Sequence, residues 1–368
     1  MRSIPFIALL FFMNFISTAF AETQWDIHGS PALDAVCLVN VLSGDPLVAE
    51  GKYYPDIEKQ FGNRLNADTH AAIGRLGAKM KEQGNLVGPT LALYLSAAPD
   101  QSLDGFIIAL RNTAALRESF FKTQFWSLDS WAKFDSVRED AGLALAGLKK
   151  AGYEKFWSQS VGPHINGRAE ALRAEIGHFD LLGEQERLLG HDFPNRKIEV
   201  LLMRFCQPYG IRITGMRFLT DVDYPNDIVL RNAAHEPFHP PFPDPAPMKL
   251  VYVALQKDPF VSRAFAKHDP KYGYNSFEGY VDEDSVQVLE QIVSERLGFA
   301  ADAATRWQEA DGGMHVLAAA LYQAMKDDEF DKRGGVYEEW LIDMVKSGRL
   351  APGKLEPLAK RVLGVKGN

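Results

Sequence analysis

Residues 233–240, Ala-Ala-His-Glu-Pro-Phe-His-Pro, constrain the fold of this chain more than any other stretch. Side chains four residues apart lie on one face of a helix, so His235 and His239 can reach a common ligand. Pro237 removes one backbone hydrogen bond of such a helix, and Pro240 disfavours helical dihedral angles at His239. We therefore predict a helix that ends no later than His239 and presents two imidazoles together.

The character of the chain changes near residue 190. Residues 66–190 carry apolar side chains at spacings of three and four, which is typical of amphipathic helices. Residues 197–205 and 211–219 are rich in Ile, Val, Leu, Phe and Arg, and a Pro/Gly-containing segment separates them. This composition predicts two strands joined by a turn, directly before the helix of the two histidines.

Helical patterns resume after a proline-rich segment, residues 240–245. They predict two short helices and then a long helix that begins near Asn275 and ends at Leu297. The fold class expected is α+β and mostly α-helical, with a small β-sheet before the histidine helix. We expect three regions after the N-terminal segment: a helical N-terminal region (22–190), a region with the sheet and both histidines (191–300), and a helical C-terminal region (301–368).

The first 21 residues resemble a secretory signal peptide. A basic start, an apolar run to Ile16 and small residues at Ala19 and Ala21 are typical of such peptides, so cleavage is expected after Ala21. No later segment has about 20 uninterrupted apolar residues, which predicts no integral membrane segment after cleavage. The protein is thus expected to be exported, either periplasmic or secreted. Its formal net charge of −8 argues against a general nucleic-acid-binding surface.

Cys37 and Cys206 are the only cysteines in the chain. In an oxidising compartment they can form one disulfide, which would connect the mature N-terminus to the segment before the histidine helix. Alternatively, they are two separate buried thiols that behave as small apolar side chains. Their number predicts no cysteine-based metal site.

The segment His235-Glu236-Pro237-Phe238-His239 matches the H-E-x-x-H pattern, and the chain resembles gluzincin-like zinc metallopeptidases over about residues 197–298. The resemblance implies that His235 and His239 bind Zn2+, and that Glu236 takes a proton from a zinc-bound water. In that group strands also precede the motif, and the edge strand of the sheet holds the substrate backbone.

A catalytic zinc site needs a third protein ligand, which in gluzincins is a Glu from a downstream helix. The acidic helix predicted over residues 278–290 supplies candidates, and we favour Glu283 over the alternative third ligand Glu278. Asp282 falls within the apolar face of this helix and needs a partner, so we expect it to hydrogen-bond a zinc-binding histidine. The alternative is that these carboxylates are solvated on a surface helix.

The resemblance also implies a Tyr or His that stabilises the oxyanion of the reaction. Tyr272, Tyr274 and Tyr280 lie near the acidic helix in sequence, and His315 is a more distant candidate. The sequence does not choose among them.

Three functions follow from these patterns. The first is an exported zinc-dependent peptidase that acts on an unidentified peptide or protein. The second is a non-catalytic exported binding protein on a degenerate metallopeptidase scaffold, suggested by the prolines around the motif. The third is a helical scaffold with an accidental motif, which predicts that His235 and His239 lie far from residues 278–290. Substrate specificity and oligomeric state do not follow from the sequence.

Overall fold

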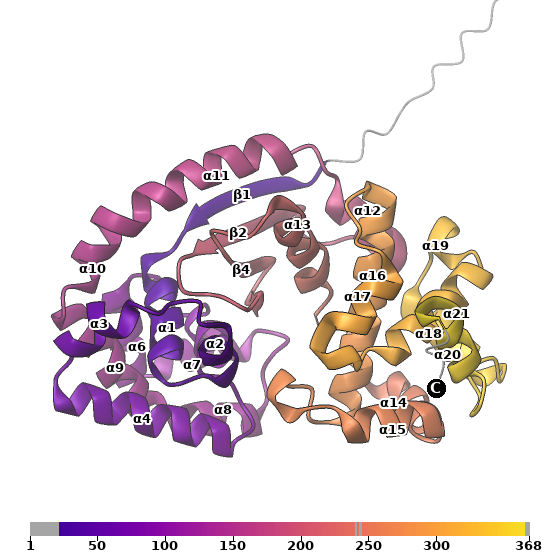
Figure 1. Cartoon of the computed structure of the whole chain (residues 1–368), viewed down its shortest axis with the longest axis horizontal. Helices are drawn as coiled ribbons and strands as arrows, with labels where there is room; N and C mark the ends of the chain where they lie inside the picture. Colours follow the sequence, from indigo (N-terminus) through magenta and orange to yellow (C-terminus); the bar gives the residue numbers. More distant parts are fainter. Residues whose placement is uncertain (1–21, 240, 243–244, 365–368) are drawn as a thin grey trace, which may run out of the picture.

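The computed structural model describes residues 22–239, 241–242 and 245–364, so the predicted signal peptide and Pro240 lie outside the described residues. The fold is α+β and mostly helical, with a small sheet between helical layers, as the sequence predicted (Figure 1). Within the described ranges, no helix has the length and apolar character needed to cross a membrane.

A four-stranded sheet lies between the N-terminal and C-terminal helices, with the strand order β1-β2-β4-β3. Its strands are β1 (Gln24–Gly29), β2 (Lys197–Met203), β3 (Ile211–Ile213) and β4 (Arg217–Asp221). β2 pairs in parallel with both β1 and β4, whereas β3 pairs antiparallel with β4. The short strand β3 is therefore an edge strand.

The observed strands differ from the two predicted ones in two respects. Residues 211–219 form no single strand beside β2, because the chain turns at Gly215 (φ +76°) into a β3–β4 hairpin, and β4 is the neighbour of β2. Strand β1 was not anticipated. Its partner among the described residues, β2, lies far along the chain, so local sequence patterns could not reveal the pairing.

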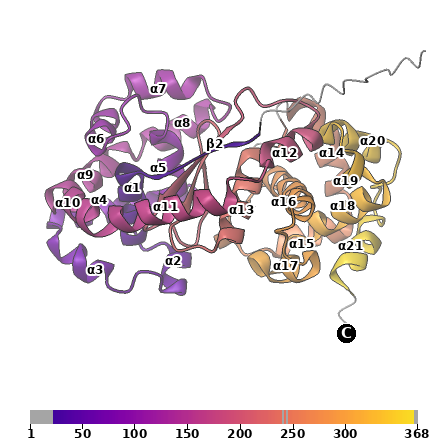
Figure 2. The ribbon, with the colours of Figure 1, turned by 90° about the horizontal axis from the view of Figure 1, so that it is seen from above.

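Helices cover both faces of the sheet. Because successive side chains of a strand point to opposite faces, one strand contributes side chains to two hydrophobic cores. In β2, Ile198, Val200 and Leu202 belong to a hydrophobic core shared with the C-terminal helices. Leu201 and Met203 belong to a second core with the N-terminal helices. The sheet thus joins two hydrophobic cores. Figure 2 shows from above the N-terminal helices on one side of β2 and the C-terminal helices on the other.

The N-terminal layer consists mainly of short helices whose first turns are capped by polar side chains. Asn66, for example, accepts the backbone N–H of Thr69 at 2.9 Å, as expected of an N-cap residue. The helices are α1 (Pro31–Leu42), α2 (Pro46–Gly51), α3 (Ile57–Gln60), α4 (Ala67–Glu82), α5 (Val87–Leu95), α6 (Leu103–Arg111), α7 (Ala114–Phe121), α8 (Leu128–Asp135) and α9 (Arg138–Lys150).

A helical segment then leads the chain along the sheet. It comprises α10 (Tyr153–Phe156), a π-helical turn (Trp157–Val161) and α11 (Gly162–Ile176), and α12 (Leu181–Leu189) follows. Helix α11 runs beside β1 (Figure 1). Gly29 allows this close approach, since a Cβ there would lie 2.7 Å from Cγ2 of Ile165.

The C-terminal layer surrounds one long helix, α16 (Phe277–Leu297). The other elements are α13 (Asn226–His235), η3 (Glu236–Phe238), α14 (Pro245–Gln256), α15 (Pro259–Lys267), η4 (Pro270–Tyr272), α17 (Ala303–Glu309), η5 (Ala310–Gly313), α18 (Val316–Asp327), α19 (Phe330–Arg333), α20 (Tyr337–Lys346) and α21 (Leu355–Leu363).

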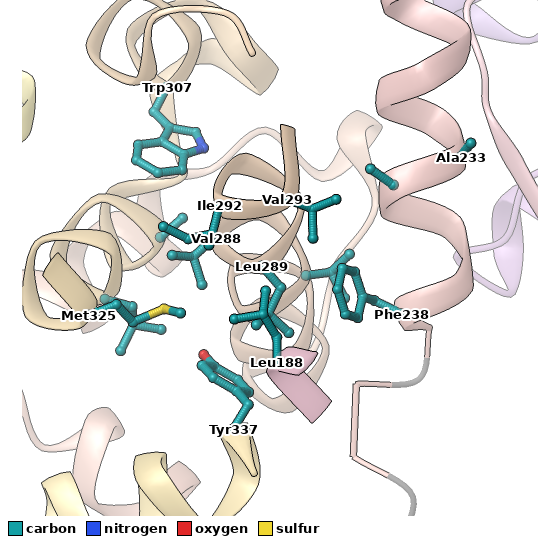
Figure 3. Close-up of a cluster of buried hydrophobic side chains, with 14 of the residues drawn as sticks. Leu188, Ala233, Phe238, Val288, Leu289, Ile292, Val293, Trp307, Met325 and Tyr337 are labelled. Atoms are coloured by element: carbon teal, nitrogen blue, oxygen red, sulfur yellow. The ribbon is translucent and has the colours of Figure 1, made fainter. Parts of the chain in front are cut away.

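Helix α16 is buried on almost every side. Figure 3 shows its apolar residues Val288, Leu289, Ile292 and Val293 within a cluster that also contains Phe238. Its buried polar residues are Glu283, Asp284, Ser285, Gln287, Glu290, Gln291 and Ser294. Buried polar groups need hydrogen-bond partners, so α16 is the element where a functional site is expected.

Candidate metal centre

Pro237 ends helix α13 and tightens the chain into the 3-10 helix Glu236–Phe238. Because proline has no N–H, the carbonyl of Ala233 loses its regular helical partner. The buried side-chain amide of Gln185, from α12, lies 2.9 Å from the Ala234 oxygen and 3.5 Å from the Ala233 oxygen. Gln185 therefore satisfies backbone acceptors that the early end of the helix leaves open.

The helix ends at His235, earlier than its predicted extension towards His239. His239 has extended dihedral angles (φ −82°, ψ 132°), and the preceding Phe238 is only 1% exposed. Phe238 packs in the same core as α16 (Figure 3). This buried ring anchors the segment, so that His239 lies beside His235 even though the two residues do not share a helix.

His235, His239 and Glu283 converge between the end of α13 and the middle of α16. The two Nε2 atoms are 3.0 Å apart. Glu283 Oε1 lies 3.6 Å from Nε2 of His235, and Glu283 Oε2 lies 3.4 Å from Nε2 of His239. Three ligands about 2.0–2.1 Å from a tetrahedral ion would be about 3.3 Å apart, so this spacing fits a zinc ion.

The surroundings of Glu283 also fit a metal ligand. Its side chain is 1% exposed, and Oε1 accepts the Gln287 amide at 2.7 Å. Oε2 has no partner in hydrogen-bond geometry among the residues that the structure describes, although it faces the imidazole of His239. A buried carboxylate oxygen without a partner is unfavourable, whereas two imidazoles and one carboxylate are a donor set that binds zinc.

The electrostatics of the cluster favour the metal-binding protonation state at two of its three residues, His235 and Glu283. Burial lowers the pKa of His235 to about 3, and the nearby Glu283 only partly opposes this effect, so the imidazole is neutral. Burial alone would raise the pKa of Glu283, but the two histidines hold it well below its usual range. Burial likewise opposes the charge of His239, yet Glu283 raises the pKa of this imidazole. A neutral imidazole and an ionised carboxylate are the ligating forms.

A chain of buried polar side chains holds Glu283 in place. Gln287, one helical turn after Glu283, accepts a hydrogen bond from Arg306 at 2.6 Å. Arg306 also donates to Gln291 at 3.0 Å and forms an ion pair with Glu290. Such partners orient a metal ligand. These hydrogen-bond partners of Glu283 were not predicted, although Glu283, Gln287 and Gln291 follow one another at a four-residue spacing, which places them on one face of a helix.

Glu236 lies beside the cluster and is 7% exposed. A Cβ at Gly210 would lie 2.9 Å from Glu236 Oε1, so this glycine leaves the room that the carboxylate occupies. Burial raises the pKa of Glu236 to about 7, against the opposing charges of His239 and Arg212 and a hydrogen bond from the Arg212 backbone. A carboxylate that titrates near neutral pH is suited to general base catalysis.

A cleft of about 660 Å³ gives access to this cluster, and we call it the main cleft. His235, Glu236 and Glu283 line one part of it. Other lining residues come from the N-terminal layer, from the segment before β3, and from the loop before α16: Tyr53, Tyr209, Gly210, Tyr272 and Tyr274. The buried groups of the cluster are thus open to a ligand.

The four candidates for an oxyanion-stabilising residue differ in whether they line the main cleft. Tyr272 and Tyr274 both line the main cleft. The phenol of Tyr274 interacts with Glu283, and burial together with nearby carboxylates raises its pKa, so it remains a protonated donor. Tyr280, by contrast, is buried and donates to the Met314 carbonyl at 2.9 Å.

The fourth candidate, His315, is fully buried between two carboxylates. Its Nδ1 lies 2.6 Å from Asp284 and its Nε2 lies 2.9 Å from Asp311. Both ring nitrogens therefore already have a carboxylate as hydrogen-bond partner. His315 links α16 to the segment that carries Asp311, a residue of the main cleft.

Two of the predicted carboxylates lie outside the cluster. Glu278 is exposed in the first turn of α16 and is absent from the groups of described residues that could hold a metal ion. Asp282 Oδ1 accepts the hydroxyl of Tyr252 at 2.7 Å, so its hydrogen-bond partner is a tyrosine rather than a zinc-binding histidine. Asp282 is still close enough to His239 for the imidazole charge to affect its pKa.

Cys37 and Cys206 are both buried, and the structure contains them as thiols. Cys206 donates to the Tyr209 carbonyl at 3.2 Å, and its contact with Cys37 raises the pKa of its thiol. The two side chains therefore lie next to each other. The disulfide stays a prediction.

A second group of metal-binding residue types, Asp26, His28 and Glu199, lies on β1 and β2. All three are partly exposed, and Lys197 forms an ion pair with Asp26 at 2.6 Å. This ammonium group would compete with a cation. The His235–His239–Glu283 cluster is more buried and lacks such a competitor among the described residues.

Comparisons of the chain with protein-family models, with curated proteins and with solved structures find no match. A function has to be inferred from the site itself. The third possibility raised above, an accidental motif, predicted that His235 and His239 lie far from residues 278–290, whereas both lie beside Glu283.

Proposed function

We propose that this protein is an exported zinc-dependent peptidase in which His235, His239 and Glu283 hold the metal. The observation that supports this most directly is the convergence of these groups beside a buried Glu236, with Glu283 Oε2 unpartnered among the described residues. When bound, zinc would supply a Lewis acid that polarises a carbonyl and acidifies a water molecule.

The residues of the chain have separate roles in this proposal. Glu236 accepts the proton of the attacking water and returns it to the nitrogen that leaves when the peptide bond breaks. Its position against Gly210 and the Arg212 backbone holds the carboxylate at the main cleft. The Tyr274 phenol, which also lines that cleft, donates to the oxygen that becomes negative during the reaction.

The prolines of the motif had suggested a non-catalytic scaffold. Pro237 is accommodated, since the Gln185 amide donates to the Ala234 carbonyl at 2.9 Å and lies 3.5 Å from the Ala233 carbonyl, and the two imidazoles still meet. This favours an enzyme over a degenerate binding protein. Export is proposed from residues 1–21, which lie outside the described residues.

The test is the Glu236→Gln variant, which changes one oxygen of the side chain and hardly alters its volume. We expect one zinc per chain by elemental analysis, as in wild type, and a loss of about 10²- to 10⁴-fold in hydrolysis of an unfolded protein substrate. Unchanged hydrolysis would refute the role of Glu236. Absence of stoichiometric zinc from both proteins would refute the metal centre.

A further inference from the structure

A second hollow of about 520 Å³ lies on the other side of the metal-binding motif, and we call it the His239 pocket. Pro237, Phe238 and His239 line it, whereas His235 and Glu236 line the main cleft. The motif therefore borders both hollows. Residues 210–216, which include the edge strand β3, also border both hollows. Gly210 lines the main cleft, whereas Arg212 and Met216 line the His239 pocket.

The two hollows differ in chemistry. The main cleft is lined by five carboxylates: Glu50, Glu236, Glu283, Glu290 and Asp311. Among the described residues that line the His239 pocket, none is acidic. Four of its apolar side chains are only partly buried and so present free apolar surface: Phe125, Leu189, Phe193 and Met216. The lining also includes the polar residues Lys122, Thr123, Gln124, His191, Asn195 and Arg212. The apolar part of such a concave lining binds an apolar side chain.

Two polar features connect this pocket to the motif. The side-chain amide of Gln124, in the segment after α7, donates to the His239 carbonyl at 3.2 Å, which ties the N-terminal layer to the motif. Arg212 has a buried Nε–H without a partner among the described residues.

We propose that the His239 pocket binds a large apolar side chain of a polypeptide substrate, next to the peptide bond that is hydrolysed. The substrate chain continues from this pocket past the metal-binding residues into the main cleft. Because both hollows flank the reacting position, hydrolysis occurs within a chain and not at its end. This inference rests on the proposed peptidase function and adds its substrate class.

The first test uses the zinc-loaded wild-type enzyme and an unfolded protein, with cleavage sites identified by mass spectrometry. We expect internal cleavage, with Phe, Leu or Met at one fixed position beside the cleaved bond. In matched peptides, replacing that residue by Ala should lower kcat/KM by about 100-fold, because the buried apolar surface of the side chain is lost. Cleavage without positional preference, or removal of single terminal residues, would overturn the inference.

The second test fills the pocket by the Met216→Trp substitution. The ratio of kcat/KM for the Phe peptide to kcat/KM for the Ala peptide should fall at least 10-fold, because the Trp side chain occupies the space of the apolar substrate residue. Leu143→Trp is the matched control, since Leu143 is 51% exposed on α9 and lines neither hollow. If M216W does not fold, Met216→Ala replaces it. The larger pocket should then favour a Trp peptide over a Phe peptide, and an unchanged preference would overturn the inference.

A binding measurement separates this inference from the proposed function. Calorimetry with zinc-loaded Glu236→Gln should show tighter binding of the Phe peptide than of the Ala peptide, and Met216→Trp in that background should remove the difference. If the zinc-loaded wild type hydrolyses no polypeptide, the proposed function fails. If it hydrolyses polypeptides but neither cleavage nor binding depends on the apolar residue, only the pocket inference fails.

Discussion

Replacing Glu283 by Gln tests the metal centre most sharply, because it removes a charge and hardly changes the volume. The amide oxygen of Gln can still accept the Gln287 hydrogen bond that Glu283 Oε1 accepts now. Its NH2 group can donate to a neutral imidazole, since both histidines lie within 3.4–3.6 Å of the carboxylate. We therefore expect the metal-free variant to remain folded.

The expected loss of zinc affinity follows from the charge that the substitution removes, because zinc would bind a buried carboxylate in the wild type and a neutral amide in the variant. Breaking a buried charge pair by removal of one partner costs about 3–5 kcal/mol. A loss of about 3 kcal/mol corresponds to a rise of about 100-fold in the zinc Kd, which we take as the lower limit.

The assay is competition for zinc against a chromophoric chelator, together with urea unfolding of the metal-free proteins. Glu278→Gln is the matched control, since Glu278 is on the same helix but exposed. It should leave the zinc Kd unchanged. Wild-type zinc affinity in E283Q, or an equal loss in E278Q, would refute the assignment of Glu283 as third ligand.

Three further results are expected. Tyr274→Phe should lower kcat about 10²- to 10³-fold with unchanged zinc content, and unchanged kcat would exclude Tyr274 as the oxyanion donor. Burial alone would lower the pKa of His315, but Asp284 and Asp311 raise it to about 10. The folded state thus binds this proton more tightly than the unfolded state, so the stabilisation is complete below about pH 6.5 and is lost as pH rises towards 10. The unfolding free energy of the metal-free wild type should therefore fall between about pH 6.5 and pH 10. The His315→Gln variant should be less stable at neutral pH and should lack this decrease. Parallel plots of unfolding free energy against pH for the two proteins would contradict the role of His315. Zinc at 100 times its Kd should raise the unfolding free energy by about 2.7 kcal/mol, which differential scanning calorimetry with and without chelator can test.

Local patterns were sufficient to predict the mostly helical α+β fold, because helical periodicity and turn residues are properties of neighbouring positions. They also singled out His235, Glu236 and His239 by spacing, and the acidic segment that contains Glu283. They did not reveal strand β1, whose pairing with β2 joins distant parts of the chain. The division of residues 211–219 into two strands was missed because a single glycine reverses the chain there.

The amino-acid sequence alone was enough to name the residue types of the proposed zinc site and to place the break that Pro237 imposes. Only the packing of α13 against α16 selected Glu283 and left Glu278 exposed. Packing also places Gln185 of α12 against the end of α13, where its amide donates to the Ala234 carbonyl, and no sequence pattern linked Gln185 to the motif. The physical reason is that side-chain spacing within a helix is set locally, whereas contact between two helices depends on how the whole core is filled.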